Sequence, residues 1–231
     1  MNASTHTCLL TEKQIQDFNR DGFVVVKRLI GREEVDQLVS DYDKALKGEI
    51  NVPTFSGTKK VIDGGVLQLA NPSRHISHWQ SHAYFRNALD IARQLLGDDL
   101  EYFYDQIIYK PPHHPGVTDW HQDAGYWSES GANSRAVTCW LALSPAFREN
   151  GSLQFIPGSH KGEVQEHRRI DSEINNALAT NADPNKAVFC TLEPGDASFH
   201  HCRTLHYAGG NTSDVQRRAL ITHFRPKVKT A

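Results

Sequence analysis

The 231-residue chain is predicted to be mainly β, with a jelly-roll core preceded by helices. From about residue 100 onward, short β-type runs alternate with turn residues, and no long helical pattern intervenes. Before that point, two segments carry apolar residues at helical spacing. The length fits one domain, which we expect over 1–231, with helical support and a lid loop in 1–99 and the core in 100–226.

The N-terminal part is expected to contain helices, one strand and a loop. Thr11 is expected to cap a short helix that ends at Phe18, and the β-branched run at 22–26 predicts a strand. In GREEVDQLVSDYDKAL the apolar positions recur every 3.6 residues, which predicts a helix. Residues 48–65, with several Gly and Pro, are predicted to form a loop over a site. A further helix is predicted for HAYFRNALDIARQLLG, ending at Gly97.

The C-terminal part is expected to supply the strands of the core. Eight short strands are predicted, near 101–110, 117–121, 136–143, 152–156, 187–192, 196–201, 204–208 and 217–225. Such a series without long intervening helices favours a jelly roll of two packed sheets. Residues 163–186 are predicted to form a helix-containing insertion over one end of it.

Composition excludes several classes of partner. The net charge of −2 gives no broad field for nucleic acid or an anionic membrane, so we expect a small-molecule substrate. The start of the chain shows no basic region followed by an apolar run, and no 18 apolar residues occur in succession, so a cytoplasmic location is expected. The four cysteines are widely spaced without a C-x-x-C pair, which favours free thiols in a reducing compartment.

A histidine and an aspartate form the first candidate for metal chemistry. In the segment TDWHQDAGYW, His121 and Asp123 have H-x-D spacing, which on an extended strand points both side chains to one face. Composition alone produces about one such pair by chance in this chain. Taken alone, the pair is better explained as a hydrogen bond on a strand face, so the metal interpretation needs further ligands.

The segment HHCRTLHYAGGNTSDVQRRALITHF offers a third ligand, His206, in a strand-like run. Two imidazoles and one carboxylate leave three positions of an octahedral ion open, which is what Fe(II) needs to take a bidentate 2-oxo acid and then dioxygen. Zinc fits less well, because a catalytic zinc site of this type usually carries a helical H-E-x-x-H, which is absent here. His200 should lie on the same face as His206, but a fourth ligand would block oxygen.

Arg217, on the strand after the glycine turn, offers a planar charged fork for the distal carboxylate of 2-oxoglutarate. Its neighbour Arg218 should point the other way by strand alternation. A surface salt bridge is the competing explanation for Arg217. Three more histidines, His75, His78 and His82, lie around a predicted helix start, where they are candidates for the rim of the site.

Longer motifs surround these residues: YKPP at 109–112, WHQDAGYW at 120–127, AVTCWLALSPAFRENGSLQFIPGSHKG at 136–162, EPGD at 193–196, and then His206, Asn211 and Arg217. With them the chain resembles the phytanoyl-CoA dioxygenase family of Fe(II)/2-oxoglutarate oxygenases, which includes the ectoine hydroxylases, over roughly 104–226. In that family an arginine that binds 2-oxoglutarate follows the distal histidine by eleven residues, the spacing of His206 and Arg217.

The resemblance implies a double-stranded β-helix (cupin-like) core in which His121, Asp123 and His206 are the catalytic metal ligands. Fe(II), 2-oxoglutarate and O2 would be needed, with ascorbate as a candidate reductant. Five further residues are implied in binding: for the cosubstrate Arg217, Thr118 and Trp140, and for the substrate Gln106 and Trp127. Packing is the competing explanation for both tryptophans, and satisfaction of a buried backbone group is the competing explanation for Gln106.

The chain also departs from known members of the family. An acidic, Gly-Pro-rich signature of ectoine hydroxylases is replaced by AGYWSESGANSRAV, which argues against ectoine as substrate. Ile108 and Ala208 stand where some relatives place polar cosubstrate contacts. Halogenating relatives lack the carboxylate ligand, whereas Asp123 is present, so oxygenation is favoured.

These features predict a dioxygenase that oxidises a C–H bond of a small polar metabolite, as in secondary metabolism. Hydroxylation is the simplest outcome, and cyclisation or desaturation are others. The alternatives are an acyl-CoA hydroxylase, a metal-dependent cupin-like isomerase or epimerase, and a non-catalytic binding module. The pocket walls are expected in 48–82, 124–134 and 163–186, which contain few lysines, so a polar and not strongly anionic ligand is expected. A CoA ester would favour more positive charge at the mouth of the pocket, so an acyl-CoA is the less favoured substrate.

Overall fold

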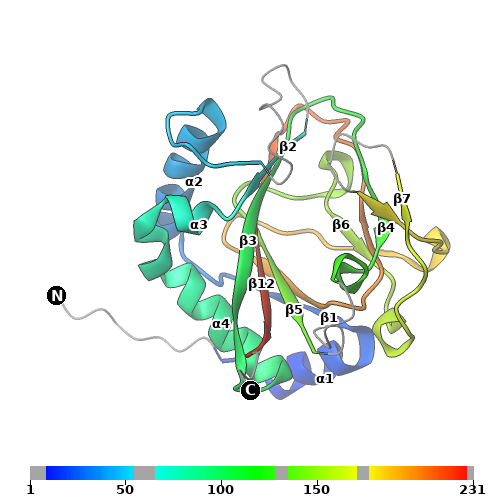
Figure 1. Ribbon diagram of the computed structural model, residues 1–231. Helices are drawn as coiled ribbons and strands as arrows, with labels where there is room; N and C mark the ends of the chain where they lie inside the picture. Colours follow the sequence, from blue (N-terminus) through cyan, green and yellow to red (C-terminus); the bar gives the residue numbers. More distant parts are fainter. Residues whose placement is uncertain (1–8, 55–65, 128–134, 171–176, 228–231) are drawn as a thin grey trace.

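The computed structural model describes residues 9–54, 66–127, 135–170 and 177–227, and Figure 1 shows their arrangement. The larger of two facing sheets is antiparallel and has the strand order β1-β10-β5-β12-β3-β2 among the described residues. Its strands are β1 (Phe23–Val26), β2 (Leu67–Ala70), β3 (Leu100–Lys110), β5 (Val137–Ala142), β10 (Ala197–His201) and β12 (Arg217–Pro226). Two of them, β1 and β2, come from the N-terminal part of the chain.

The smaller sheet is also antiparallel, with the order β4-β11-β6-β9 among the described residues. Its strands are β4 (Thr118–His121), β6 (Leu153–Phe155), β9 (Val188–Phe189) and β11 (His206–Ala208). Short 3-10 helices connect the strands: η2 (Asp123–Tyr126), η4 (Arg148–Asn150), η5 (Ser159–Lys161) and η6 (Pro184–Lys186). This two-sheet architecture is the double-stranded β-helix that the sequence predicted.

Strand alternation gives the larger sheet two different faces. On β5, Val137, Cys139 and Leu141 join the apolar core that also contains helix residues such as Tyr84 and Ile91. The intervening residues of the same strand, Thr138, Trp140 and Ala142, face the smaller sheet, where Trp140 and Ala142 meet Leu153, Phe155 and Ala208. The first face therefore holds the main core, and the second is free to carry polar groups.

Four α-helices flank the larger sheet and pack on its outer face (Figure 1). They are α1 (Glu12–Asp21), α2 (Arg32–Lys47), α3 (Pro72–His75) and α4 (Ala83–Leu96), with the 3-10 helix η1 (Ser77–Ser81) between the last two. Thr11 caps α1 as predicted, in a capping box with Gln14, but the helix continues past Phe18 to Asp21. It ends at Gly22, whose φ of 84° is a left-handed conformation that glycine adopts without strain.

Two expectations differ from the structure. The described part of 163–186 has no α-helix: Arg168–Arg169 (β7) and Leu178–Ala179 (β8) pair as strands, and the Thr180 N–H donates to the Trp120 carbonyl at 2.8 Å. Residues 171–176 of this segment lie outside the described residues. The edge strand β2 was not predicted, because four residues next to a loop carry little periodicity. Much of the expected lid loop, 55–65, lies outside the described residues.

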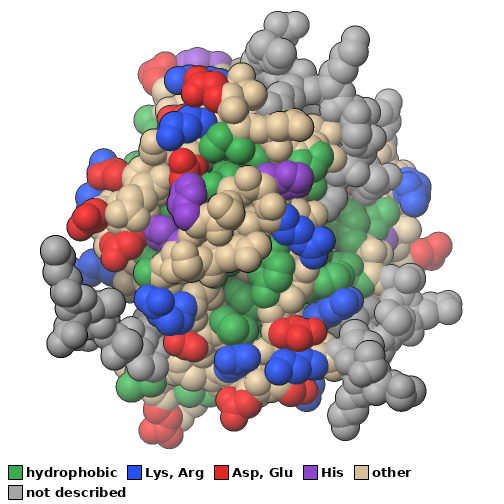
Figure 2. All heavy atoms as spheres, turned by 60° about the vertical axis from the view of Figure 1, so that its left-hand side comes forward, with side chains coloured by type: hydrophobic (Ala, Val, Ile, Leu, Met, Phe, Trp, Pro, Cys, Tyr) green, Lys and Arg blue, Asp and Glu red, His purple; other side chains and the backbone are tan. Residues whose placement is uncertain are grey.

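The surface agrees with the charge balance of the sequence. On the face shown in Figure 2, acidic and basic side chains are interspersed without a field of one sign. In the described part of the chain, no helix is long and apolar enough to cross a membrane. Cys139, Cys190 and Cys202 are buried free thiols.

Candidate metal centre

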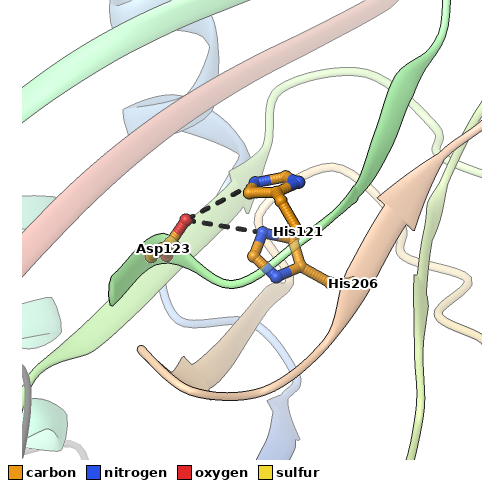
Figure 3. A group of neighbouring side chains, drawn as sticks. All are labelled: His121, Asp123 and His206. Carbon is orange, nitrogen blue, oxygen red and sulfur yellow. Dashed lines mark ion pairs between the residues drawn. The ribbon is translucent and has the colours of Figure 1, made fainter. Parts of the chain in front are cut away.

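Three potential metal ligands meet between the two sheets. His121 ends β4 and His206 begins β11, and the two residues are paired in the antiparallel register. Their ring centroids lie 4.0 Å apart. Oδ1 of Asp123 lies 3.6 Å from Nε2 of His121 and 3.5 Å from Nε2 of His206 (Figure 3). All three ligand atoms lie within 4.8 Å of one another, and all three residues are buried, so the group could hold one metal ion.

The H-x-D pair lies at the end of a strand. β4 ends at His121, Gln122 keeps an extended backbone (φ −117°, ψ 133°), and Asp123 begins the 3-10 helix η2, so both ligand side chains lie on one side as expected. The intervening Gln122 is 1% exposed, and its amide donates to the Arg203 carbonyl at 2.7 Å and accepts from the Gln165 N–H at 2.8 Å. These bonds anchor the residue between the two ligands.

Backbone carbonyls orient both imidazoles. Nδ1 of His121 bonds to the carbonyl of Asp119 at 2.7 Å, and Nδ1 of His206 bonds to the carbonyl of Thr204 at 2.9 Å. Because a carbonyl only accepts, each Nδ1 carries the proton and each Nε2 presents its lone pair to the centre. Burial, together with His121, lowers the pKa of His206 well below its usual range, which keeps that ring neutral and able to bind metal.

The two oxygens of Asp123 have different surroundings. Oδ2 accepts hydrogen bonds from the Thr138 hydroxyl at 2.5 Å and from Nε2 of His200 at 3.2 Å, whereas Oδ1 faces the two histidines. Burial alone would raise the pKa of Asp123, but His206, His121 and His200 hold it well below its usual range. The carboxylate is therefore ionised, with one oxygen held by the protein and the other available to a metal.

Arg217 lines the same cavity from the side of the larger sheet. It is 1% exposed, its Nη1 donates to the Gly151 carbonyl at 2.5 Å, and its guanidinium lies 5.4 Å from the Trp140 ring. Its Nε has no hydrogen-bond partner, and no carboxylate among the described residues pairs with it. Burial lowers the pKa of Arg217 to about 10. Arg218 points to the other face and pairs with Asp43 at 2.8 Å, as predicted.

Two connected chambers surround these groups. The first contains the three ligands, Arg217 and the predicted cosubstrate neighbours, and its lining includes Thr118, Trp140, Ile108, Ala208 and Leu153. The second has a volume of about 530 Å³ and shares His121, Asp123 and Gln106 with the first. Aromatic side chains dominate its walls: Phe103, Tyr104, Tyr126 and Trp127. All eight predicted site residues therefore line one chamber or the other.

The sequence interpretation missed a group of polar residues behind Asp123. His223 and Thr138 face the cavity from β12 and β5, and their side chains are hydrogen-bonded at 2.9 Å. Burial lowers the pKa of His223 to about 4. Strand alternation contained the signal for His223, because it lies six residues after Arg217 on one predicted strand and so faces the same side.

Other histidines named from the sequence lie outside both chambers. His78 forms an ion pair with Asp41 at 2.6 Å, and the side chain of His82 caps α4 by accepting from the Tyr84 N–H. These two residues and His75 are absent from the lining of the cavities around the ligands. A role at the rim is therefore not supported for them.

Comparison with known proteins identifies the family. The model of the phytanoyl-CoA dioxygenase (PhyH) family matches residues 18–219. A probable alpha-ketoglutarate-dependent hypophosphite dioxygenase of Stutzerimonas stutzeri is 28% identical over 92% of this chain and 77% of its own length. The peroxisomal phytanoyl-CoA dioxygenase of Homo sapiens is 24% identical, over 94% of this chain and 68% of its own length.

Solved structures agree with the family match. EvdO2 from Micromonospora carbonacea var. aurantiaca, complexed with 2-oxoglutarate, superimposes with a TM-score of 0.81 at 29% identity, covering 96% of this chain and 94% of its own. The epimerase SnoN, in complex with Fe3+, alpha ketoglutarate and nogalamycin RO, gives 0.72 at 25% identity over 93% and 83% of the two chains. The chain therefore belongs to the phytanoyl-CoA dioxygenase family of iron(II)- and 2-oxoglutarate-dependent dioxygenases.

Proposed function

We propose that this dioxygenase oxidises a C–H bond of a small polar metabolite, with Fe(II) held by His121, Asp123 and His206 and 2-oxoglutarate held by Arg217. The buried guanidinium of Arg217, with its unpartnered Nε, is the observation that carries this proposal. A buried cation costs several kcal/mol unless an anion compensates it. A dicarboxylate that reaches from the metal to Arg217 is such an anion. The three metal ligands and Arg217 line one cavity, which such a molecule could bridge.

Two further residues are proposed to flank the cosubstrate. Trp140 packs beside the Arg217 guanidinium and closes one side of the chamber, and Thr118 lies on β4 in register with Ala208. With Ile108 and Ala208 apolar, the polar contacts of the distal carboxylate fall to Arg217 and the Thr118 hydroxyl. We therefore expect the arginine to contribute most of the 2-oxoglutarate affinity.

When bound, Fe(II) with 2-oxoglutarate and dioxygen supplies an oxidant that can remove a hydrogen atom from carbon, while the oxo acid becomes succinate and carbon dioxide. The chain contributes position and exclusion of water. His121 and His206 donate neutral imidazoles, Asp123 adds one negative charge, and Trp127 and Gln106 line the space next to them. Their geometry decides which hydrogen of the substrate approaches the metal.

The second chamber favours a small molecule that has both an apolar face and hydrogen-bonding groups. Among the described residues, its walls combine four aromatic rings with the amides of Gln68 and Gln106 and a single Lys or Arg side chain, Arg169. The many phosphate charges of a CoA ester would need more positive charge than this, so an acyl-CoA is disfavoured. Hydroxylation is the outcome we propose. Epimerisation is the second candidate, because SnoN is both 2-oxoglutarate-dependent and an epimerase.

The test uses purified protein with Fe(II) and 2-oxoglutarate, first without oxygen and then in air. We expect a weak visible charge-transfer band from the chelated metal, and succinate release that a metabolite screen should stimulate. His206→Ala should lose both signals. His113→Ala is the control, because His113 is exposed, pairs with Asp214 and lines neither chamber. No band and no succinate from the unaltered protein would refute the proposal.

A further inference from the structure

Four side chains form a continuous hydrogen-bonded chain from the substrate chamber to the carboxylate of Asp123. The Gln68 amide donates to Oε1 of Gln106 at 2.5 Å, and Nε2 of Gln106 lies 3.2 Å from Nε2 of His223. Nδ1 of His223 lies 2.9 Å from the Thr138 hydroxyl, which donates to Oδ2 of Asp123 at 2.5 Å. We call Gln68, Gln106, His223 and Thr138 the relay.

The relay crosses the inner face of the larger sheet at right angles to its strands. Each member comes from a different strand, in the order β2, β3, β12 and β5, which are adjacent in the sheet. Thr138 and His223 are direct partners in the register of β5 and β12. The sheet itself therefore fixes the spacing of the relay, and a single shift of register would break it.

The donors of the relay all point toward the metal ligand. The ionised carboxylate of Asp123 only accepts, so it takes the single hydroxyl hydrogen of Thr138. The Thr138 oxygen must then accept from Nδ1–H of His223, which leaves Nε2 of that ring as an acceptor for the Gln106 amide. Oε1 of Gln106 in turn accepts from Gln68. Each bond thus fixes the direction of the next.

The two ends of the relay lie in different chambers. Gln68 lines only the substrate chamber, Thr138 lines only the chamber that holds all three metal ligands and Arg217, and Gln106 and His223 line both. The His223 ring between them is clamped by aromatic walls: it stacks on Tyr104 with centroids 4.1 Å apart and meets the edge of Trp127 at 5.9 Å. The ring is thus held in place between its two hydrogen-bond partners, Gln106 and Thr138.

We propose that the relay positions Asp123 for the metal. Gln106 and His223 have no hydrogen bond to Asp123, although Nδ1 of His223 lies 3.9 Å from Oδ2, and they act on the carboxylate through the hydroxyl of Thr138. The hydrogen bond to Oδ2 leaves Oδ1 as the single coordinating oxygen and keeps open the positions that a second carboxylate contact would occupy. This inference rests on the proposed function, since it takes His121, Asp123 and His206 as the ligands. Thr138, His223 and Gln106 are positioning residues in this scheme.

The test measures binding of Co(II) alone to the metal-free protein, together with the visible d–d spectrum of the bound ion. Thr138→Val keeps the shape and removes the hydroxyl, and should raise the dissociation constant about tenfold to hundredfold, as losses of outer hydrogen bonds to metal ligands typically do. His223→Phe keeps the ring and removes both nitrogens, and should raise it by a smaller factor. Thr138→Ser should restore binding, because the hydroxyl returns.

A double variant separates a relay from two independent contacts. If His223 acts only through Thr138, then Thr138→Val with His223→Phe should bind Co(II) no more weakly than Thr138→Val alone. Thr222→Val is the matched control: Thr222 is buried in the same sheet, but its hydroxyl bonds to Tyr84 at 2.8 Å on the opposite face. Its loss should lower the melting temperature without changing the Co(II) affinity or spectrum.

The outcomes distinguish the relay from the proposed function. Normal Co(II) binding by Thr138→Val, or effects of Thr138→Val and His223→Phe that multiply in the double variant, would overturn the relay and leave the metal ligands in place. Failure of the unaltered protein to bind Co(II) would overturn both proposals. A shared spectral change in Thr138→Val and His223→Phe, absent in Thr222→Val, would support the relay.

Discussion

Replacement of Arg217 by methionine should separate the stability of the protein from its affinity for 2-oxoglutarate. Burial depresses the pKa of Arg217 from 12.5 to about 10, which corresponds to about 3 kcal/mol of unfavourable charge burial at neutral pH. Arg217→Met removes that cost and retains the apolar stem. It also leaves the Gly151 carbonyl without its donor, which costs about 1–3 kcal/mol. The two terms nearly cancel, so we expect the ligand-free variant to melt at or slightly above the wild-type temperature.

Addition of 2-oxoglutarate should separate the two proteins by their melting temperatures. With Co(II) present and 2-oxoglutarate at about 100 times its dissociation constant, the wild type should gain about 2.7 kcal/mol. For a chain of this size, that gain corresponds to a rise of about 5–11 °C in melting temperature. Arg217→Met should lose most of this rise, because truncation of one partner of a buried charge pair costs about 2–5 kcal/mol of binding.

Both the ligand-free stability and the ligand-induced rise can be tested by thermal unfolding with and without 2-oxoglutarate. The proteins compared are the wild type, Arg217→Met and Arg218→Met. Arg218 is the matched control, since it is the next residue but points away from the cavity and pairs with Asp43. Arg218→Met should keep the full ligand-induced rise. A ligand-free Arg217→Met that melts many degrees below the wild type, yet still responds to 2-oxoglutarate, would refute the reasoning.

Three further predictions concern single positions. Gly151→Ala should weaken 2-oxoglutarate binding and lower stability, because Gly151 has a φ of +80° and an added Cβ would lie 2.3 Å from the Gly209 carbonyl oxygen. Calorimetric titration measures the loss of affinity, and thermal melting measures the loss of stability. Thr11→Ala should cost about 1 kcal/mol in urea unfolding through loss of the α1 cap. Burial would raise the pKa of Asp196, but Lys27 and backbone N–H groups lower it below the pKa of the unfolded chain. The ionised carboxylate therefore stabilises the fold at pH values above its unfolded pKa, and this stabilisation is lost as the pH falls through the folded pKa. Asp196→Asn should therefore cost about 1–3 kcal/mol at pH 7, and the difference from wild type should shrink below about pH 4 in urea titrations; an equal difference at pH 7 and pH 3 would contradict this.

The strand pattern of the core could be predicted from the sequence, because its strands are long enough to show a period. β3, β5, β10 and β12 lie where alternating or β-branched runs placed them, within one or two residues. Three short elements were not predicted. β2, β7 and β8 have two to four residues each, and their existence depends on partners that are distant in the sequence.

The candidate site shows the same division. The motifs pointed to His121, His206 and Arg217, and all three line one cavity, but the pairing of His206 with His121 across β4 and β11 was not predicted. The position of Asp123 follows from the extended backbone at Gln122, although the 3-10 helix that begins at Asp123 was not predicted. The relay was missed because its members lie on four strands, and only the order of those strands in the sheet brings them together.

The two faces of the larger sheet explain how the fold tolerates such a site. The helix-covered face is closed by apolar contacts among residues such as Leu38, Tyr84 and Ile91, each with no exposed surface. The inner face instead keeps buried polar atoms without partners, including Nε of Arg217 and Nδ1 of His200. Unpaired buried groups of this kind are costly, and they persist where the rest of the structure compensates for them and function requires them. Since strand alternation separates the two faces within the same six strands, the inner face can be tuned to a metal, a cosubstrate and a substrate with little change in the packing that holds the sheet.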